Sequence, residues 1–410
     1  MTREAQEGPA EVMTRTAQEG PADMMTREAP EGPADVMTRE APAVSILLPC
    51  RNADPVLLTR AVDSILAQTY PDYELLIIDD GSEERYARAL RSEAARDGRI
   101  RLLQQAPSGV SAARNRGIRE AKGRYITLLD ADDTVSPWFL EEAVRAADAL
   151  AADFVIGGTV YIYDGQSVPE DRATAGTNIA RNATERTSAG PASARDATER
   201  TSARLDPVRD AVELTPARLH ATRAECIGEP YRFDDKAYIN RGIAARLVRR
   251  ELLTDGFLFP EHLRIAEDAS WNLALVSAFH GYYVPSIWYY YYENGKSVSN
   301  RFNPRVIRDM EDHLEVIRGQ MDLTNDTEYR AFMDLMMDDL RYIHKCMVGN
   351  PRWKASTAKR RKVLAHLYGD LPWKEMANRR YLRLAPLRNR WKAELYRLRL
   401  LFVFWALRRS

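Results

Sequence analysis

The stretch Tyr125-Ile126-Thr127-Leu128-Leu129-Asp130-Ala131-Asp132-Asp133 decides how the fold of this chain is interpreted. Its first five residues favour a β-strand, and three carboxylates follow within four positions. In an open α/β sheet these acids would lie at the carboxyl end of the strand, where such sheets bind ligands. Clustered carboxylates repel one another, and a hard divalent cation, Mg²⁺ or Mn²⁺, relieves that repulsion. A second interpretation stays open, in which the acids form a solvated turn and Asp132 or Asp133 caps a helix that begins near Pro137.

Strands and helices alternate on both sides of this stretch. Apolar runs predict further strands at residues 44–49, 73–78, 100–103 and 154–158, with helices between them. Nearly continuous apolar strands separated by helices favour a mostly parallel sheet that is covered on both faces. The strand at 73–78 runs into Asp79-Asp80, just as the central strand runs into Asp130. Because parallel strands end at the same edge of a sheet, we expect the two acid-rich loops to lie together, which favours a ligand site over a solvated turn.

Two segments have repetitive, polar sequences. Residues 1–43 contain three near-copies of a 12-residue unit rich in Glu, Pro, Gly and Ala. Residues 164–205 contain the sequence Ala-Thr-Glu-Arg-Thr-Ser-Ala twice. Neither segment has enough apolar side chains to offset the entropy of ordering. We therefore expect the first to be disordered and the second to be a flexible insertion in a surface loop.

The rest of the sequence divides into one domain and an extension. Residues 44–163 and 206–300 are expected to form the two halves of a single α/β domain. In the second half, helical spacing predicts a helix at 243–253, and an aromatic run predicts a strand at 282–292. Residues 301–410 are expected to form a helical, basic C-terminal region.

Composition excludes several classes of protein. The chain of 410 residues has no net formal charge, so no overall field favours nucleic acid. Its three cysteines, Cys50, Cys226 and Cys346, are far apart, which indicates neither a zinc site nor a disulfide framework. A reducing cytoplasm is the expected location. The sequence has no apolar leader, so we expect no signal peptide. It also has no apolar run of about 18 residues, so we expect no membrane-spanning helix.

The C-terminal sequence is strongly basic. From Pro351 onward there are 17 Lys or Arg residues against 3 Asp or Glu residues. Residues 395–409 mix arginine with aromatic and aliphatic side chains, and this stretch is too short and too charged to span a bilayer. Two interpretations stay open: the tail lies in the interface of an anionic membrane, or it packs on the domain with its arginines in water. RNA binding is less favoured, because no recognised RNA-binding module accompanies the charge.

Several motifs follow one another in a specific order. They are Val44-Ser45-Ile46-Leu47-Leu48-Pro49 with Asn52, Ser64-Ile65-Leu66-Ala67-Gln68-Thr69-Tyr70, Ile77-Ile78-Asp79-Asp80-Gly81-Ser82, Gly109 to Ile118, Gly123 to Asp133, and Glu267-Asp268 at a helix start. In this order they resemble the family-2 glycosyltransferases, which are inverting nucleotide-sugar enzymes of the GT-A fold, and in particular the bacterial enzymes of cell-surface polysaccharides. The resemblance covers residues 44 to 300 and implies an α/β GT-A domain followed by a helical extension.

The resemblance also implies roles for individual residues. The nucleotide-sugar would be bound by Pro49, Asp80, Arg114 and Asp130. Asp80 would accept a hydrogen bond from the imide N–H of uracil, and Asp130 would face the ribose. Arg114 would assist with phosphate or pair with a structural carboxylate. Asp132, together with Asp130, would hold Mn²⁺ or Mg²⁺, which neutralises the diphosphate leaving group. The role of Asp133 stays open.

Asp268 matches the catalytic base of the resembled family. It would take the proton from the acceptor hydroxyl while that oxygen attacks the anomeric carbon opposite the leaving nucleotide. This single displacement would invert the anomeric configuration. Without the resemblance, Asp268 would be interpreted as a carboxylate at a helix N-terminus. The adjacent Glu267 is the alternative base.

The implied function is hexosyl transfer from a nucleotide-sugar, preferably a UDP-sugar, to a cell-envelope glycan or a lipid-linked acceptor. The expected location is the cytoplasm or the cytoplasmic face of the membrane. One alternative is a sugar nucleotidyltransferase, although the usual Gly-rich triphosphate loop is missing near the first strand. Another is a non-catalytic glycan or membrane scaffold. The acids at Asp80, Asp130, Asp132 and Asp268 argue against that scaffold.

Overall fold

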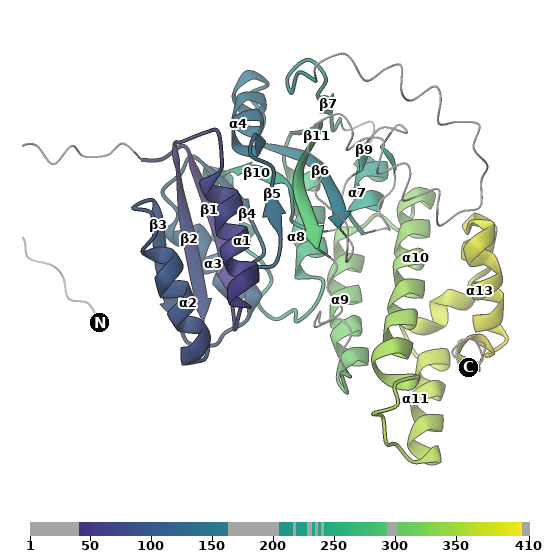
Figure 1. Ribbon diagram of the computed structural model, residues 1–410. Coiled ribbons are helices and arrows are strands. Elements are labelled where there is room, and N and C mark those ends of the chain that lie inside the picture. The colour runs from purple at the N-terminus through teal and green to yellow at the C-terminus, as the bar shows by residue number, and fades with distance from the viewer. Residues whose placement is uncertain are drawn as a thin grey trace, which may run out of the picture. The chain divides into compact units, whose positions relative to one another are not determined.

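The computed structural model describes residues 41–162, 205–215, 219–227, 232–233, 237–238, 242–292 and 302–403. The expectations for most of the N-terminal repeats, for nearly all of the insertion and for residues 404–410 lie outside the described residues. The chain from Ala41 onward forms one compact unit, whose described parts are drawn in colour in Figure 1.

One large sheet runs through this unit. Its strands are β1 (Val44–Cys50), β2 (Tyr73–Asp80), β3 (Ile100–Gln105), β4 (Tyr125–Leu128), β5 (Thr134–Val135), β6 (Phe154–Ile162), β7 (Val212–Glu213), β10 (Arg246–Arg249) and β11 (Gly281–Tyr292). Their order in the described chain is β3-β2-β1-β4-β10-β6-β11-β5, and β7 pairs with β11. A separate antiparallel pair joins β8 (Arg232–Phe233) to β9 (Ala237–Tyr238). Strands β1 to β4 are parallel, as their apolar sequences predicted.

The segment 243–253 is not a helix, contrary to the sequence-based prediction. It forms strand β10, followed by a 3-10 turn at Arg250–Leu252. β10 lies between β4 and β6 and is antiparallel to both, with Leu247 and Val248 buried. Apolar spacing could not reveal this, because a short segment becomes a strand when the fold supplies partners on both sides. Since β5 is also antiparallel to β11, the sheet is mixed beyond β4.

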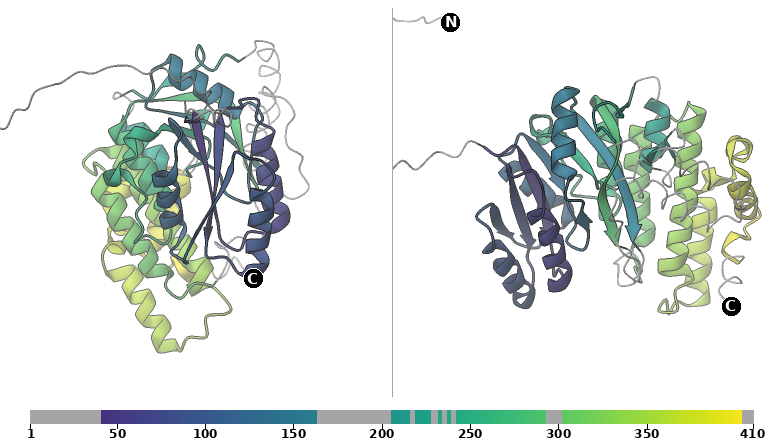
Figure 2. Two further views of the ribbon diagram at one scale, coloured as in Figure 1. Left: turned by 90° about the vertical axis from the view of Figure 1, so that its left-hand side faces the viewer. Right: turned by 45° about the horizontal axis from the view of Figure 1, so that its top comes forward.

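Helices cover both faces of the sheet, as expected. They are α1 (Pro55–Leu66), α2 (Glu84–Ala94) and α4 (Phe139–Ala149) on one face, and α3 (Val110–Glu120) and α8 (Glu267–Ala278) on the other. Figures 1 and 2 show these layers. Helix α1 begins at Pro55 because the preceding Asp54 side chain accepts a hydrogen bond from the Val56 N–H at 3.0 Å and proline suits the first helical position.

The C-terminal region is a helical layer on the side of α8 that faces away from the sheet (Figures 1 and 2). It contains α9 (Val306–Gln320), α10 (Asp326–Ile343), a π-helical turn (His344–Val348), α11 (Thr357–Gly369), a 3-10 turn (Trp373–Ala377), α12 (Arg379–Leu384) and α13 (Leu387–Arg397). The earlier helix α7 (Leu219–Ile227) packs against this layer. Leu273 of α8 belongs to the apolar core of this layer, so α8 has one side on the sheet and one on the helices. None of the helices in the described ranges combines the length and the apolar character needed to cross a bilayer.

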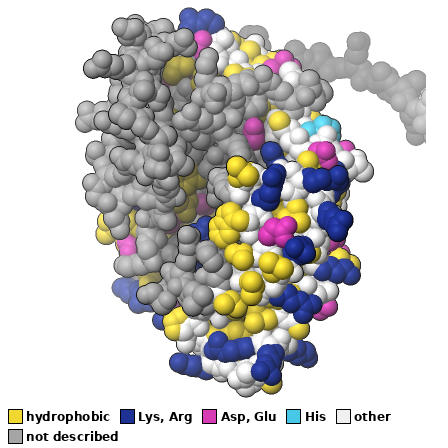
Figure 3. All heavy atoms as spheres, turned by 90° about the vertical axis from the view of Figure 1, so that its right-hand side faces the viewer, with side chains coloured by type: hydrophobic (Ala, Val, Ile, Leu, Met, Phe, Trp, Pro, Cys, Tyr) yellow, Lys and Arg dark blue, Asp and Glu magenta, His cyan; other side chains and the backbone are white. Residues whose placement is uncertain are grey.

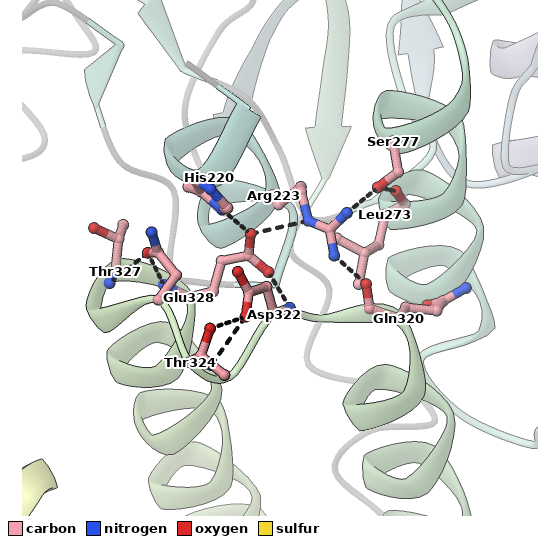
Figure 4. Close-up of polar contacts among 10 residues, drawn as sticks. His220, Arg223, Leu273, Ser277, Gln320, Asp322, Thr324, Thr327 and Glu328 are labelled. Atoms are coloured by element: carbon pink, nitrogen blue, oxygen red, sulfur yellow. Dashed lines mark hydrogen bonds and ion pairs between the residues drawn. The ribbon is translucent and has the colours of Figure 1, made fainter. Parts of the chain in front are cut away.

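A buried carboxylate joins the helical layer to α7 and α8 (Figure 4). Glu328 of α10 is fully buried; it accepts a hydrogen bond from the Asp322 N–H at 2.7 Å and pairs with His220 and Arg223 of α7. Arg223 also donates to Ser277 of α8 at 2.9 Å. A buried carboxylate costs several kcal/mol unless it is paired and hydrogen-bonded. This network therefore sets the position of α8, whose first turn carries the predicted base.

Candidate active site

The two acid-rich loops lie at the same edge of the sheet. β1 separates β2 from β4, and all three strands are parallel, so the residues after β2 and β4 leave the sheet on the same side. Cys50, at the end of β1, lies between the two loops. Burial raises the pKa of its thiol well above the usual range, and the negative charges of Asp79 and Asp130 raise it further. The sequence-based prediction that these loops converge is therefore confirmed.

Asp80 organises the turn that precedes α3. Its Oδ1 accepts hydrogen bonds from Gln105 Nε2 at 2.8 Å and from the Ser108 N–H at 2.7 Å. Its Oδ2 accepts from the Gly109 N–H at 2.9 Å and lies 3.8 Å from Arg51 Nη1. A carboxylate has about four acceptor positions, and this loop occupies three of them. The buried Asp80 therefore has a structural task that the sequence did not reveal. These three donors leave one acceptor position of its carboxylate, beside Arg51.

The turn after β2 requires glycine. Asp79 Oδ1 accepts a hydrogen bond from the Ser82 N–H at 2.8 Å, which closes the turn. Gly81 has a φ of +70°, and a Cβ at this position would lie 2.4 Å from Pro107 Cγ. Any side chain here would push the loop 105–109 away from Asp80. The sequence Asp-Asp-Gly-Ser thus shapes the edge on which the nucleoside was predicted to bind.

Pro49 fits its place in the middle of the sheet because the ladder between β1 and β4 ends before it, while β1 still pairs with β2 there. β1 pairs with β4 only as far as Leu47, whose carbonyl accepts from the Leu129 N–H at 3.0 Å. Pro49 is two residues further on, so its backbone nitrogen is on the side of β1 that faces β4. Because the pairing with β4 has ended, the missing N–H costs no hydrogen bond. It lies beside Cys50 at the edge from which both acid loops start.

Strand β11 holds the loop 130–133, which we call the acid loop. The Tyr289 hydroxyl donates to Asp133 Oδ2 at 2.7 Å and accepts from the Asp130 N–H at 3.3 Å, and the Tyr292 N–H donates to Asp133 Oδ1 at 2.9 Å. Asp133 is buried. Burial raises the pKa of its carboxyl to about 8, and the charge of Asp130 adds to that rise. Asp133 therefore holds the loop rather than facing a ligand.

Arg60 of α1 supports the acid loop from the other side. Its guanidinium donates to the carbonyl oxygen of Asp132 and lies 3.6 Å from the ring centroid of Tyr292. The sequence predicted that the tyrosine run is a strand and that a helix lies between residues 49 and 73, where Arg60 is found. Nothing in the spacing marked either as a support for the acids, because their partners come from distant segments.

Arg114 connects the acid loop to the first turn of α8. Its Nη1 donates to Glu267 Oε1 at 2.7 Å, and its Nη2 lies 3.4 Å from Asp130 Oδ1. Burial alone would lower the pKa of this guanidinium, but the surrounding carboxylates, Asp130 first, raise it above the usual value. Of the two roles considered for Arg114, the contacts match that of a partner for carboxylates.

Asp268 lies in the first turn of α8, next to Glu267. The preceding Ala266 has a φ of 56°, and this left-handed residue directs the chain into the helix. Asp268 is partly exposed, and its Oδ1 accepts from the Ala269 N–H at 2.8 Å. Desolvation raises the pKa of the Asp268 carboxyl to about 6 and the charge of Glu267 adds to the rise, while Arg114 opposes it. Such a carboxylate is a stronger base than an ordinary aspartate.

The acid loop has carboxylate oxygens, which are the ligands that a hard divalent cation prefers. Within the described ranges, no group of three or more His, Cys, Asp or Glu side chains could hold a metal ion by itself. Asp130 and Asp132 are partly exposed, and their negative charges both raise the pKa of Asp133. Mg²⁺ commonly uses one or two carboxylates and completes its shell with phosphate oxygens and water. The residues therefore fit such an ion when a phosphate group supplies the remaining ligands.

Comparisons with known proteins agree with this architecture. Residues 45–202 match the protein family described as Glycosyl transferase family 2. The "Uncharacterized glycosyltransferase EpsJ" of Bacillus subtilis (strain 168) is 38% identical over 112 residues, 27% of this chain and 32% of that protein. "Glycosyltransferase GlyG" of Streptococcus pneumoniae is 37% identical over 122 residues, 30% of this chain and 40% of that protein. The crystal structure of S. aureus TarS 1–349 in complex with UDP has a TM-score of 0.51 at 15% identity, over 87% of this chain and 88% of that chain.

The fold is therefore that of the GT-A glycosyltransferases, as expected from the sequence. Over residues 45–202 the chain is similar to glycosyl transferase family 2. The matched segments span less than half the length of these two curated relatives. The roles of Pro49, Asp80, Arg114, Asp130, Asp132 and Asp268 remain predictions.

Proposed function

We propose that this protein is a metal-dependent, inverting glycosyltransferase. It transfers a hexose from a nucleotide-sugar, preferably a UDP-sugar, to a hydroxyl group of a cell-envelope glycan or a lipid-linked acceptor. One observation carries the proposal: Arg114 contacts both Asp130 and Glu267, so the start of α8 lies beside the acid loop. A candidate base and a candidate phosphate site are thus brought together from segments that are far apart in the sequence.

The proposed roles are of two kinds: binding of the nucleotide with its cation, and transfer of the acceptor's proton. Pro49 and the remaining acceptor position of Asp80 would bind the nucleoside, and Asp130 and Asp132 would hold a divalent cation. When bound, that ion supplies positive charge to the departing diphosphate. Asp268 would accept the acceptor's hydroxyl proton as the oxygen attacks the anomeric carbon. With a pKa of about 6, its carboxyl is mostly ionised at neutral pH and able to do so.

The test is nucleotide release from a panel of nucleotide-sugars, measured with and without Mn²⁺ or Mg²⁺. We expect release that depends on the metal and falls roughly 100-fold or more in Asp268→Asn, since general bases contribute about 10² to 10⁴ in rate. Glu251→Gln is the matched control, because this exposed carboxylate lies in the turn after β10. Full activity in Asp268→Asn would remove this residue as the base. Nucleotide-sugar binding that depends neither on the metal in the wild type nor on the substitution Asp132→Ala would contradict the metal assignment.

The same assay separates the alternatives. A sugar nucleotidyltransferase would consume a nucleoside triphosphate and release pyrophosphate instead of a nucleoside diphosphate. A scaffold would bind glycan or nucleotide without turnover, and Asp268→Asn would then bind like the wild type. Determining the anomeric configuration of the product by NMR distinguishes inversion from retention.

A further inference from the structure

Helix α13 packs on the helical layer through one of its faces. Asn389, Ala393 and Tyr396 are buried on this face. The Tyr396 hydroxyl donates to the Trp373 carbonyl at 2.7 Å, and Asn389 Nδ2 donates to Asp334 Oδ1 at 2.7 Å. Leu401 and Phe402, beyond the helix, are buried too. Up to residue 403, the tail is therefore docked on the protein, which was one of the two interpretations left open by the sequence.

The opposite face of α13 is exposed and has an unusual composition. Apart from Glu394, which pairs with Arg397 at 2.7 Å, its residues are Leu387, Arg390, Trp391 and Arg397, and Leu398 continues the face just past the end of the helix. Leu387 is 79% exposed and Leu398 is 54% exposed. After the helix, Leu400 and Val403 are also exposed, at 47% and 54%. We call these seven residues the outer face of α13.

Basic side chains surround these exposed apolar groups. Residues 351–403 contain 15 Lys or Arg residues and 3 Asp or Glu residues. Figure 3 shows the side of the molecule on which α13 lies, with hydrophobic side chains gathered in the middle and Lys and Arg interspersed among and below them. Isolated exposed apolar residues are normal in soluble proteins, but a group of them within a basic surface marks an interaction site. The sequence beyond Val403 has the same character, Phe404-Trp405-Ala406-Leu407-Arg408-Arg409.

We propose that the outer face of α13 rests on an anionic lipid membrane. The combination of leucine, tryptophan and arginine on one helix face is typical of helices that lie in the plane of a bilayer interface. Leucine and tryptophan side chains enter the headgroup region, while the guanidinium groups pair with lipid phosphates. RNA would use the arginines and Trp391 but would gain nothing from the exposed leucines. A membrane uses both kinds of side chain.

The proposal can be tested by flotation of the full-length chain with vesicles. We expect binding to phosphatidylcholine vesicles that contain phosphatidylglycerol, weak binding to phosphatidylcholine alone, and a loss of binding at high salt. The double variants Leu387→Gln/Leu398→Gln and Arg390→Gln/Arg397→Gln should each bind less, the second by roughly fivefold per arginine. The matched controls are Val56→Gln, 76% exposed on α1, and Arg88→Gln on α2, and both should bind like the wild type.

Three results would overturn the proposal. The first is an absence of binding to anionic vesicles by the folded wild type. The second is binding that the leucine variant retains in full and that a single-stranded RNA competes away, which would indicate a site for polyanions. The third is a dimer, detected by light scattering, that the leucine variant dissociates, which would indicate that a second copy covers this face. Vesicle binding requires no sugar donor, so these outcomes are independent of the proposed catalysis.

Discussion

The Tyr289 hydroxyl donates to the buried carboxyl group of Asp133 at 2.7 Å and also accepts from the backbone N–H of Asp130 at 3.3 Å. These two acids are the ends of the acid loop, so one hydroxyl from β11 secures both ends. The strand after the predicted base thus supports the loop that was predicted to hold the cation. This relationship leads to the first prediction.

Replacing Tyr289 with phenylalanine should weaken both stability and nucleotide binding. The change leaves Asp133 buried with one hydrogen bond fewer, which costs about 1–3 kcal/mol in the free energy of unfolding. The acid loop loses its fixed geometry, so the affinity for a nucleotide with Mn²⁺ should fall as well. Urea unfolding and calorimetric titration measure the two effects. Tyr290→Phe is the control, because the Tyr290 hydroxyl has no hydrogen bond with other described residues; equal effects in both variants would contradict the assigned role.

Asp133→Asn should change how stability depends on pH. The pKa of Asp133 is raised from 3.8 to about 8 by burial and by Asp130, so the folded state binds more protons than the unfolded state between these values. The contribution of this group to the free energy of unfolding therefore falls as the pH rises through that window. Asparagine has no proton to lose. Relative to the wild type, the variant should be more stable at about pH 8 than at about pH 5.

Urea unfolding in the presence of a chelator measures this difference, because a bound cation would lower the pKa of Asp133 and flatten the curve. The exposed Glu84→Gln, on α2, serves as the control for removal of a carboxylate. A stability difference between Asp133→Asn and the wild type that is the same at both pH values would show that Asp133 is ionised throughout.

Arg114→Gln should shift the acid limb of the pH–activity profile to higher pH. Desolvation and the charge of Glu267 raise the pKa of Asp268 to about 6, and this value already includes the opposing effect of Arg114, whose charge lowers it. Without that charge the base is protonated at higher pH, so activity should fall more at pH 6 than at pH 8. The uncompensated Glu267 should also cost about 3–5 kcal/mol in stability.

Arg114→Lys keeps the charge and should restore the wild-type pH profile while lowering stability less, which separates the electrostatic role from folding. Arg116→Lys, at a partly exposed site on the same helix, is the control. An Arg114→Gln variant that folds and has an unchanged pH profile would exclude the coupling between this arginine and Asp268.

Gly81→Ala should destabilise the protein and weaken nucleotide binding. A left-handed backbone costs about 1–2 kcal/mol for a residue with a Cβ, and the 2.4 Å approach to Pro107 adds to this. Gly319→Ala in α9 is the opposite case, because no atom lies within 4 Å of its added Cβ. That variant should gain about 0.5–1 kcal/mol from helix propensity. Thermal unfolding compares the stability of the two variants. An unchanged stability of Gly81→Ala would show that the loop can move to make room for the added Cβ and would contradict the prediction.

The sequence by itself determined the local secondary-structure elements and the edge of the sheet at which the acid-rich loops lie. The apolar runs at 44–49 and 73–78 and the Asp54-Pro55 helix start depend on contacts between neighbours in the chain. Because parallel strands end at one edge, the convergence of Asp80 with Asp130 followed from these elements alone. The docking of residues 395–403 was one of two open interpretations, because an amphipathic helix shows its apolar face but not which surface covers it.

The tertiary structure decided everything that depends on partners distant in sequence. Arg246–Arg249 became a central strand because β4 and β6 were available on both sides, which no periodicity within the segment could show. Asp133 became a buried anchor because Tyr289 reached it, and Arg114 paired with Glu267 rather than facing solvent. Local sequence encodes backbone preference and amphipathic pattern. The pairing of buried polar groups is set only when packing excludes water and leaves each charge one satisfactory neighbour.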